Sequence, residues 1–84
     1  MIDQLISEGE KLQHQIKQGT VGKYLNGVDF EAWVAKTILF LEKNHKDSSL
    51  TEKALVKNKE LSQRSSVHTY EFLLGTLKAI KESA

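Results

Sequence analysis

The sequence is 84 residues long, which allows one domain, 1–84, and no more. Hydrophobic residues make up 39% and charged residues 27%, a balance typical of a folded chain and not of a disordered one. The 12 basic and 11 acidic residues leave a net charge of +1, which excludes a strongly basic, histone-like binder of nucleic acid. Cysteine and proline are both absent, so disulfides and cysteine metal sites are excluded and a helical fold is favoured.

We expect a cytoplasmic protein without a membrane-spanning segment. No apolar run approaches the roughly 20 residues that a helix needs to span a bilayer. The N-terminal stretch MIDQLISEGEKLQ contains Asp3 and many polar side chains, and it lacks the basic start and apolar centre of a secretory signal.

The first predicted element is a helix over residues 2–17. Its apolar face recurs at helical spacing and consists of Ile2, Leu5, Ile6, Gly9, Leu12 and Ile16. Lys17 is expected in the last turn, where the helix dipole favours a cation, and Gly19 in the left-handed position that ends the helix. Residues 19–28 contain three of the five glycines and are predicted to form the one long loop, with Tyr24 and Leu25 folded back onto the core.

A second helix is predicted over residues 29–44, with Asp29 as its N-cap. Its apolar face comprises Phe30, Trp33, Val34, Thr37, Ile38 and Leu41. Leu39 and Phe40 widen this face, so the stretch ILFL is apolar nearly all round. A helix of this kind is central in a bundle or is covered on a second side by a partner.

Two further helices complete the predicted fold. The third covers residues 50–61, begins with a capping box from Ser49 to Glu52, and has a narrow apolar face. The fourth runs over residues 66–82 with Ser66 as its N-cap, and Gly75 in its middle indicates either a close helix crossing or a glycine that the helix merely tolerates. The expected fold is therefore all-α, a small bundle of three long helices and one shorter helix.

Three segments, LISEGEKL, FEAWVAKTILFLEKNHKDSS and YEFLLGTLKAIKE, resemble a small all-helical domain of bacterial and prophage proteins. That domain has no assigned function and occurs alone or at the N-terminus of longer chains, some of them linked to phage defence. The landmarks of the resemblance are Trp33, Leu41, Tyr70, Gly75 and Leu77, which are packing residues. The residues around His45 depart from the glycine-containing turn of the pattern. The resemblance implies an accessory or interaction module.

The sequence offers little support for catalysis or cofactor binding. His14, His45 and His68 have no i, i+4 pairing, and the order of His68 and Glu71 reverses that of dinuclear carboxylate bundles. Ser65 and Ser66 lack a nucleophile elbow, and GTVGKYLNG lacks the order of a phosphate-binding loop. We therefore expect no enzyme, no metal, no cofactor and no small-molecule substrate.

Residues 48–64 hold the one local excess of positive charge. Lys53 and Lys57 are i, i+4 neighbours and Arg64 follows on a similar face, so these three residues are candidate phosphate contacts of a weak nucleic-acid binder. Glu52 and Glu60 dilute the charge, and a solvated helix face is the preferred interpretation of residues 53–64.

The preferred functional prediction is a protein–protein interaction or oligomerisation module, and the resemblance implies a prophage connection. Leu39, Phe40 and Phe72 lie off the centres of their apolar faces and are the candidate interface. Aromatic residues in such positions either wrap the edge of the core or mark an interface, and both alternatives stay open for Phe40 and Phe72. A second copy of the chain would cover them, so we expect a homodimer formed by the second helix and the edge of the fourth.

Overall fold

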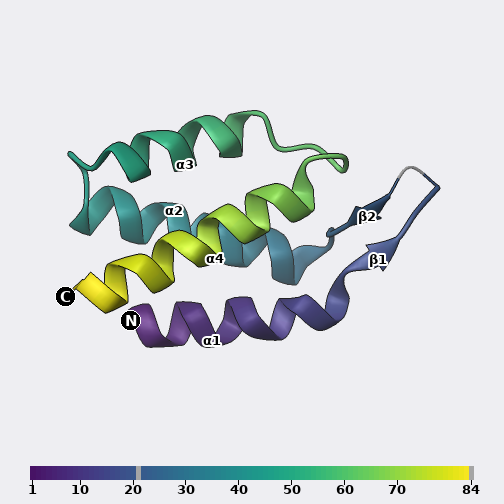
Figure 1. Ribbon diagram of the computed structural model, residues 1–84, viewed down its shortest axis with the longest axis horizontal. Coiled ribbons are helices and arrows are strands. Elements are labelled where there is room, and N and C mark those ends of the chain that lie inside the picture. The colour runs from purple at the N-terminus through teal and green to yellow at the C-terminus, as the bar shows by residue number, and fades with distance from the viewer. Residues whose placement is uncertain (21, 84) are drawn as a thin grey trace.

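The computed structural model describes residues 1–20 and 22–83 and is an elongated all-helical bundle of 39 × 23 × 20 Å (Figure 1). Its helices are α1 (Ile2–Leu12), α2 (Val28–Asn44), α3 (Ser49–Lys59) and α4 (Ser66–Ser83). A 3₁₀ turn, η1 (Gln13–Gln15), follows α1, and the strands β1 (Lys17–Gln18) and β2 (Lys23–Tyr24) pair antiparallel. The predicted all-α bundle is confirmed, although α1 is as short as α3, with 11 residues each.

In the four-helix bundle, α1 and α3 each pack against both α2 and α4. In Figure 1, α4 lies in front of α2, with α3 above and α1 below. α1 begins and α4 ends at the same end of the bundle, and the β1–β2 hairpin projects from the opposite end. α2 is thus covered on its inner side by the other three helices.

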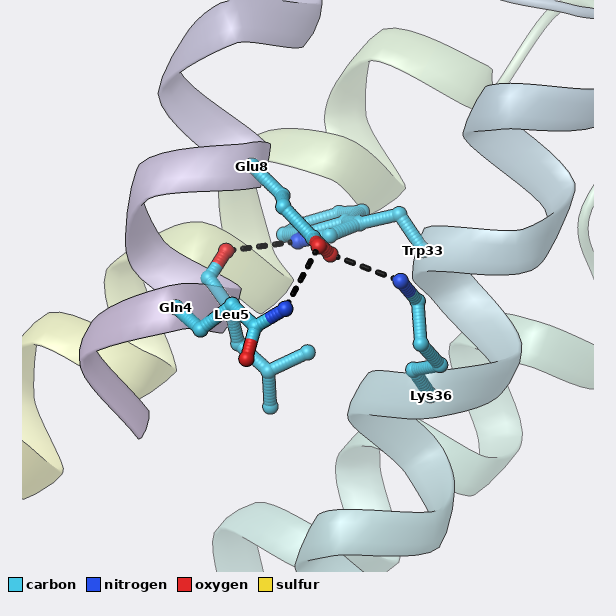
Figure 2. Close-up of polar contacts among 5 residues, drawn as sticks. All are labelled: Gln4, Leu5, Glu8, Trp33 and Lys36. Atoms are coloured by element: carbon cyan, nitrogen blue, oxygen red, sulfur yellow. Dashed lines mark hydrogen bonds and ion pairs between the residues drawn. The ribbon is translucent and has the colours of Figure 1, made fainter. Parts of the chain in front are cut away.

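The centre of the core is a junction of α1, α2 and α4 around Trp33, whose side chain is 1% exposed. Its indole Nε1 donates to the Leu5 carbonyl at 2.8 Å (Figure 2), and the Tyr70 hydroxyl donates to the Gly9 carbonyl at 2.6 Å. The Gln13 amide donates to Glu10 and Lys11, so the Gly9 carbonyl is left for Tyr70. Burial raises the pKa of Tyr70 and keeps its hydroxyl protonated.

Gly9 permits the close approach of α1 and α2 at this junction. A Cβ at position 9 would lie 2.7 Å from Cζ2 of Trp33 and 3.0 Å from Cδ1 of Leu74, closer than carbon atoms pack. The prediction of a close crossing at Gly75 is wrong: among the described residues, no atom lies within 4 Å of a Cβ built there. Gly75 is exposed because the helical period turns it away from the core.

Ion pairs fasten α1 to both of its neighbours. Glu8 meets Lys36 of α2 at 2.8 Å, and two residues of α1 meet α4, with Glu10 at 3.3 Å from Lys78 and Asp3 at 2.5 Å from Lys81. The hydrogen bond from Lys81 lowers the pKa of Asp3, and the same contact raises the pKa of Lys81. These exposed pairs fix the orientation of α1 more than they add stability.

The first helix ends earlier than predicted. Ile16 is extended, with φ −65° and ψ 127°, so Lys17 lies in a strand and Gly19 does not end a helix. Gly19 instead packs against the ring of Tyr24 across the hairpin. The predicted folding back of Leu25 is confirmed, since Leu25 is 2% exposed.

The predicted N-caps of α2 and α3 are wrong because both helices begin earlier than expected, with caps two residues and one residue before the predicted ones. The N-cap of α2 is Gly27, whose φ of 103° suits glycine, so Asp29 lies in the first turn and accepts a hydrogen bond from the Gln15 side chain instead. The N-cap of α3 is Ser48, whose hydroxyl accepts from the Leu50 amide at 3.2 Å, so no capping box starts at Ser49.

Ser66 is buried in the first turn of α4 and is not its N-cap as predicted. Its hydroxyl donates to the Gln63 carbonyl and accepts from the Leu25 amide, both at 2.8 Å. The helix capping position falls to Ser65, whose carbonyl accepts from Thr69 at 2.9 Å. Ser66 therefore ties the segment after the hairpin to the start of α4.

Candidate interaction surface

The side of α2 that faces solvent carries an apolar row, which we call the outer row: Val28, Ala32, Ala35 and Leu39. All four residues are exposed, and the two large ones at its ends are 83% (Val28) and 65% (Leu39) exposed. They alternate at spacings of four and three residues, the pattern of a helix that packs against another helix. The outer row is therefore an apolar helix face that no helix in residues 1–20 and 22–83 covers.

The helical period explains why the outer row is left outside. The residues of α2 that pack on the other helices are Phe30, Trp33, Val34, Thr37, Ile38 and Leu41, all buried as predicted. At about 100° per residue they cover the opposite side of the helix from the outer row. α2 is thus apolar on two faces, of which the bundle covers one.

Charged residues border the outer row, and their signs differ on its two sides. Lys36 and Lys43 lie about 50–70° to one side of the centre of the row, and Glu31 and Glu42 lie at similar angles on the other side. All four are exposed. Within the described residues, Glu31, Glu42 and Lys43 form no ion pair. Asp29, which is exposed and about 90° from the centre of the row, lies on the same side as the two lysines. The surface therefore has a mainly basic edge next to α1 and an acidic edge away from it.

Glu8 of α1 holds Lys36 at the basic edge. Figure 2 shows the Glu8 carboxylate between the Lys36 ammonium, at 2.8 Å, and the Gln4 amide, at 3.3 Å. The hydrogen bond from Lys36 lowers the pKa of Glu8. The Lys36 side chain is still 52% exposed, and an ammonium has three donors, so it can donate a hydrogen bond to a second carboxylate.

A shallow apolar hollow of about 220 Å³ lies beside the Leu39 end of the outer row, between α1 and α2. Met1, Leu5, Leu39 and Phe40 supply its apolar lining. Met1 is 80% exposed, so the apolar surface continues from Leu39 onto the start of α1. Phe40 is half-buried and its ring lies 5.7 Å from that of His45, measured between centroids.

The three residues of the predicted interface do not share one surface. Leu39 and Phe40 line the same hollow, whereas Phe72 lies on α4 beside α3. The Lys57 ammonium lies over the Phe72 ring, 5.9 Å from its centre, so Lys57 covers part of the Phe72 side chain. Leu39 is the most exposed of the three, since Phe40 and Phe72 are half-buried.

The three basic candidates are exposed but are not on one helix face. Lys53 and Lys57 are on α3, which ends at Lys59, so Arg64 lies in the connection that follows. Arg64 faces the hairpin, where it lines a hollow with Lys23, Tyr24 and Gln63. Their role as phosphate contacts stays a prediction, and it now concerns two separate places.

The histidines are distributed over the molecule. His14 and His68 are exposed, and His68 lies 4.0 Å from Glu71. Within the described ranges, no three histidine, aspartate or glutamate side chains converge as metal ligands would. In the same ranges no helix is long and apolar enough to cross a membrane.

Sequence reasoning missed most of the outer row. Because the second helix was expected to begin at Asp29, Val28 fell outside it, and Ala32 and Ala35 were not assigned to an apolar face. The spacing of Val28, Ala32, Ala35 and Leu39 was the signal that could have found the row, provided that the helix began one residue earlier.

Comparison of the chain with protein-family models, with curated proteins and with solved structures finds no match. The resemblance to a small helical domain of bacterial and prophage proteins therefore stays a prediction, and the function rests on the surface of the molecule itself.

Proposed function

We propose that the chain is an oligomerisation module, a protein–protein interaction domain in which the outer row of α2 binds a second copy of the chain. The observation that carries the proposal is the exposure of Val28 and Leu39, 83% and 65%, at the ends of one continuous apolar row. Single exposed apolar side chains are common on monomers, but two at coiled-coil spacing joined by two alanines are a helix-binding pattern.

The energetics favour covering this row. Each square ångström of apolar surface removed from water contributes about 25 cal/mol. A domain of this size buries about 60% of the surface of its unfolded chain, so its own core is small and an added interface is a substantial gain. The adjoining hollow at Met1 and Phe40 extends the apolar surface toward the area of about 1,200 Å² that stable interfaces bury.

A second copy is the occupant that the charges favour. The outer row has a basic edge and an acidic edge, so the surface is electrostatically complementary to itself. Isologous dimers use one patch on both subunits, and two-fold dimers are the commonest oligomers. A partner of strong single charge would be attracted by one edge and repelled by the other.

Sedimentation equilibrium at tens of micromolar tests the proposal. The parent is expected to sediment at twice the 9.5 kDa of one chain, and Leu39→Asp as a monomer with the helicity of the parent. Lys53→Asp, on α3 and away from the outer row, is the matched control and is expected to stay dimeric. A parent that remains a 9.5 kDa species at hundreds of micromolar, or a Leu39→Asp dimer, would refute the proposal.

The cytoplasmic location and the prophage connection belong to the same proposal and rest on the sequence. Dimers found by cross-linking in the cytoplasmic fraction of the native host would support the location, and dimers confined to another fraction would contradict it.

A further inference from the structure

We infer that the two copies pair with their α2 helices parallel, so that each residue of the outer row lies beside the same residue of the second copy. This inference rests on the proposed function, because it specifies the arrangement of the same surface. The observation that carries it is the unlike charge on the two edges of the row, and the pattern of large and small residues along the row is compatible with it.

The edges distinguish the two possible arrangements. A two-fold axis along the helices brings the acidic edge of one α2 against the basic edge of the other. A two-fold axis across the helices brings like edges together, with Glu31 near Glu31 of the second copy and Lys36 near Lys36, and Asp29 is the one opposite charge that then faces Lys36 of the second copy. Opposite charges at these positions select orientation, and like charges count against it. The edge charges therefore favour the parallel pair.

The parallel arrangement forms specific ion pairs. Glu31 is followed five residues later by Lys36, the offset that joins facing edge positions in parallel two-stranded coils. Glu42 and Lys43 are adjacent in sequence and lie on opposite edges at nearly the same height. Glu42 of each copy therefore lies beside Lys43 of the other copy. Lys36 would share its ammonium between Glu8 of its own chain and Glu31 of the second copy.

The apolar residues fit the same arrangement. Ala32 and Ala35 at the centre allow the two helix axes to approach to about 8 Å, the short end of helix packing distances. Leu39 then packs on Leu39 at one end and Val28 on Val28 at the other. The start of α1 and the end of α4 lie near the C-terminal end of α2, at a hollow lined by Ile2, Phe40 and Ile80. In the parallel pair, these helix ends of both copies would lie at the same end of the dimer.

Single cysteines test the orientation directly, because the chain has no cysteine of its own. A disulfide requires Cα atoms about 4.4–6.8 Å apart. In the parallel pair, Val28→Cys alone and Leu39→Cys alone each link to their own copy, shifting the band on a non-reducing gel to twice 9.5 kDa. In the antiparallel pair, each of these cysteines lies about 16 Å along the axis from its own copy, and a link forms only when the two variants are mixed.

Val56→Cys, on α3 and 53% exposed, is the control for random collision and is expected to stay at 9.5 kDa. Links from each single variant support the inference. A link that needs the mixture overturns the parallel arrangement while leaving the dimer intact. A parent that is monomeric in the centrifuge overturns the proposed function instead, so the two failures are distinguishable.

A charge exchange gives a second reading that does not depend on oxidation. In the parallel pair, the lysine of Glu42→Lys faces Lys43 of the second copy. The like charges repel, so the dissociation constant of the dimer is expected to rise. The double variant E42K/K43E restores the pair and is expected to restore parent affinity. In the antiparallel arrangement these positions lie beyond the start of the facing helix, so neither variant would change the dissociation constant, and that result would contradict the inference.

Discussion

α1 and α3 have the same length of 11 residues and the same two neighbours, yet they are held by different means. α1 receives two buried hydrogen bonds on its carbonyls, from Trp33 and Tyr70, and it makes ion pairs with α2 and α4. Its buried residues are Leu5, Ile6, Gly9 and Leu12. The buried residues of α3 are the small Thr51 and Ala54.

Two helices of equal length with the same neighbours can therefore differ in their buried residues and in the hydrogen bonds that join them to the bundle. The packing of α3 relies on half-buried leucines, a cap at Ser48, and a hydrogen bond from the Thr51 hydroxyl to the His45 carbonyl at 2.6 Å. Segments with few buried apolar contacts open first. We expect amides of α3 to exchange with deuterium before those of α1.

The largest expected effect is at the junction that holds α1. Trp33→Ala removes a buried indole and its hydrogen bond to Leu5, and it is expected to lower the free energy of unfolding by about 3–5 kcal/mol. Since small domains are stable by only about 5 kcal/mol, the variant should be largely unfolded. Circular dichroism melting measures this. A melting curve equal to that of the parent would mean that Trp33 does not anchor α1.

A smaller effect is expected from Gly9→Ala, whose methyl group would enter the space of the Trp33 ring. Overpacking of this kind costs about 1–3 kcal/mol. Gly75→Ala is the matched control on an exposed helix position and should raise the free energy of unfolding by about 1 kcal/mol through helix propensity. Urea unfolding measures both, and equal shifts of the same sign would contradict the close contact of α1 with α2.

On the α3 side, Ser48→Ala removes the helix cap and is expected to cost about 1 kcal/mol. Ser49→Ala, one residue along and exposed, is expected to cost almost nothing. Hydrogen exchange of α3 should accelerate in the first variant and not in the second. If Ser49→Ala has the larger effect, the helix begins one residue later than the structure places it.

α2 contacts both α1 and α3. A substitution at its Thr37 is expected to raise the free energy of unfolding, whereas the substitutions at Trp33, Gly9 and Ser48 lower it. Thr37 is 0% exposed, and its hydroxyl has no hydrogen-bond partner among the described residues. Because an unsatisfied buried hydroxyl costs about 1–3 kcal/mol, Thr37→Val should raise the free energy of unfolding by about 1 kcal/mol. Urea unfolding measures the change, and a lowered midpoint would indicate that the hydroxyl has a partner.

The smallest effect is expected at the ion pairs of α1. The pKa of Asp3 lies below its ordinary value of 3.8 because Lys81 donates a hydrogen bond to the carboxylate. A lowered pKa contributes stability above that ordinary value, and the contribution is lost as pH falls through the folded-state pKa. The urea midpoint of Asp3→Asn should therefore lie slightly below that of the parent at pH 7 and match it in strong acid or high salt. A difference that persists in acid would contradict this origin.

Much of the bundle could be predicted because helical periodicity is a strong signal. The buried face of α2 was identified residue by residue, and so was that of α1 as far as Leu12. Helix ends were harder, because a serine next to the true cap fits the same pattern, as Ser49 beside the cap Ser48 illustrates. Ile16 continues the helical spacing of the apolar residues, although its backbone is extended and its side chain packs against the core from there. Periodicity alone therefore could not predict that the first helix ends before Ile16.

The candidate surface was only partly predictable. Leu39 was identified from its apolar surroundings, but the opposite faces of a helix that is apolar on two sides cannot be separated until the neighbouring helices are placed. Gly9 and Gly75 make the same point: both are helical glycines in the sequence, and only the position of the Trp33 ring decides which of them is needed.

Trp33 is the single tryptophan of the chain, so the junction carries its own optical reporter. The indole is shielded from water and lies 5.5 Å from the ring of Tyr70, close enough for energy transfer between the two chromophores. Its emission follows the meeting of α1, α2 and α4 and is blind to the loosening of α3. Fluorescence and far-ultraviolet dichroism recorded on one sample would coincide if the domain melts as one unit. A dichroism signal that falls before the fluorescence changes would show that α3 unfolds while the core around Trp33 is still folded.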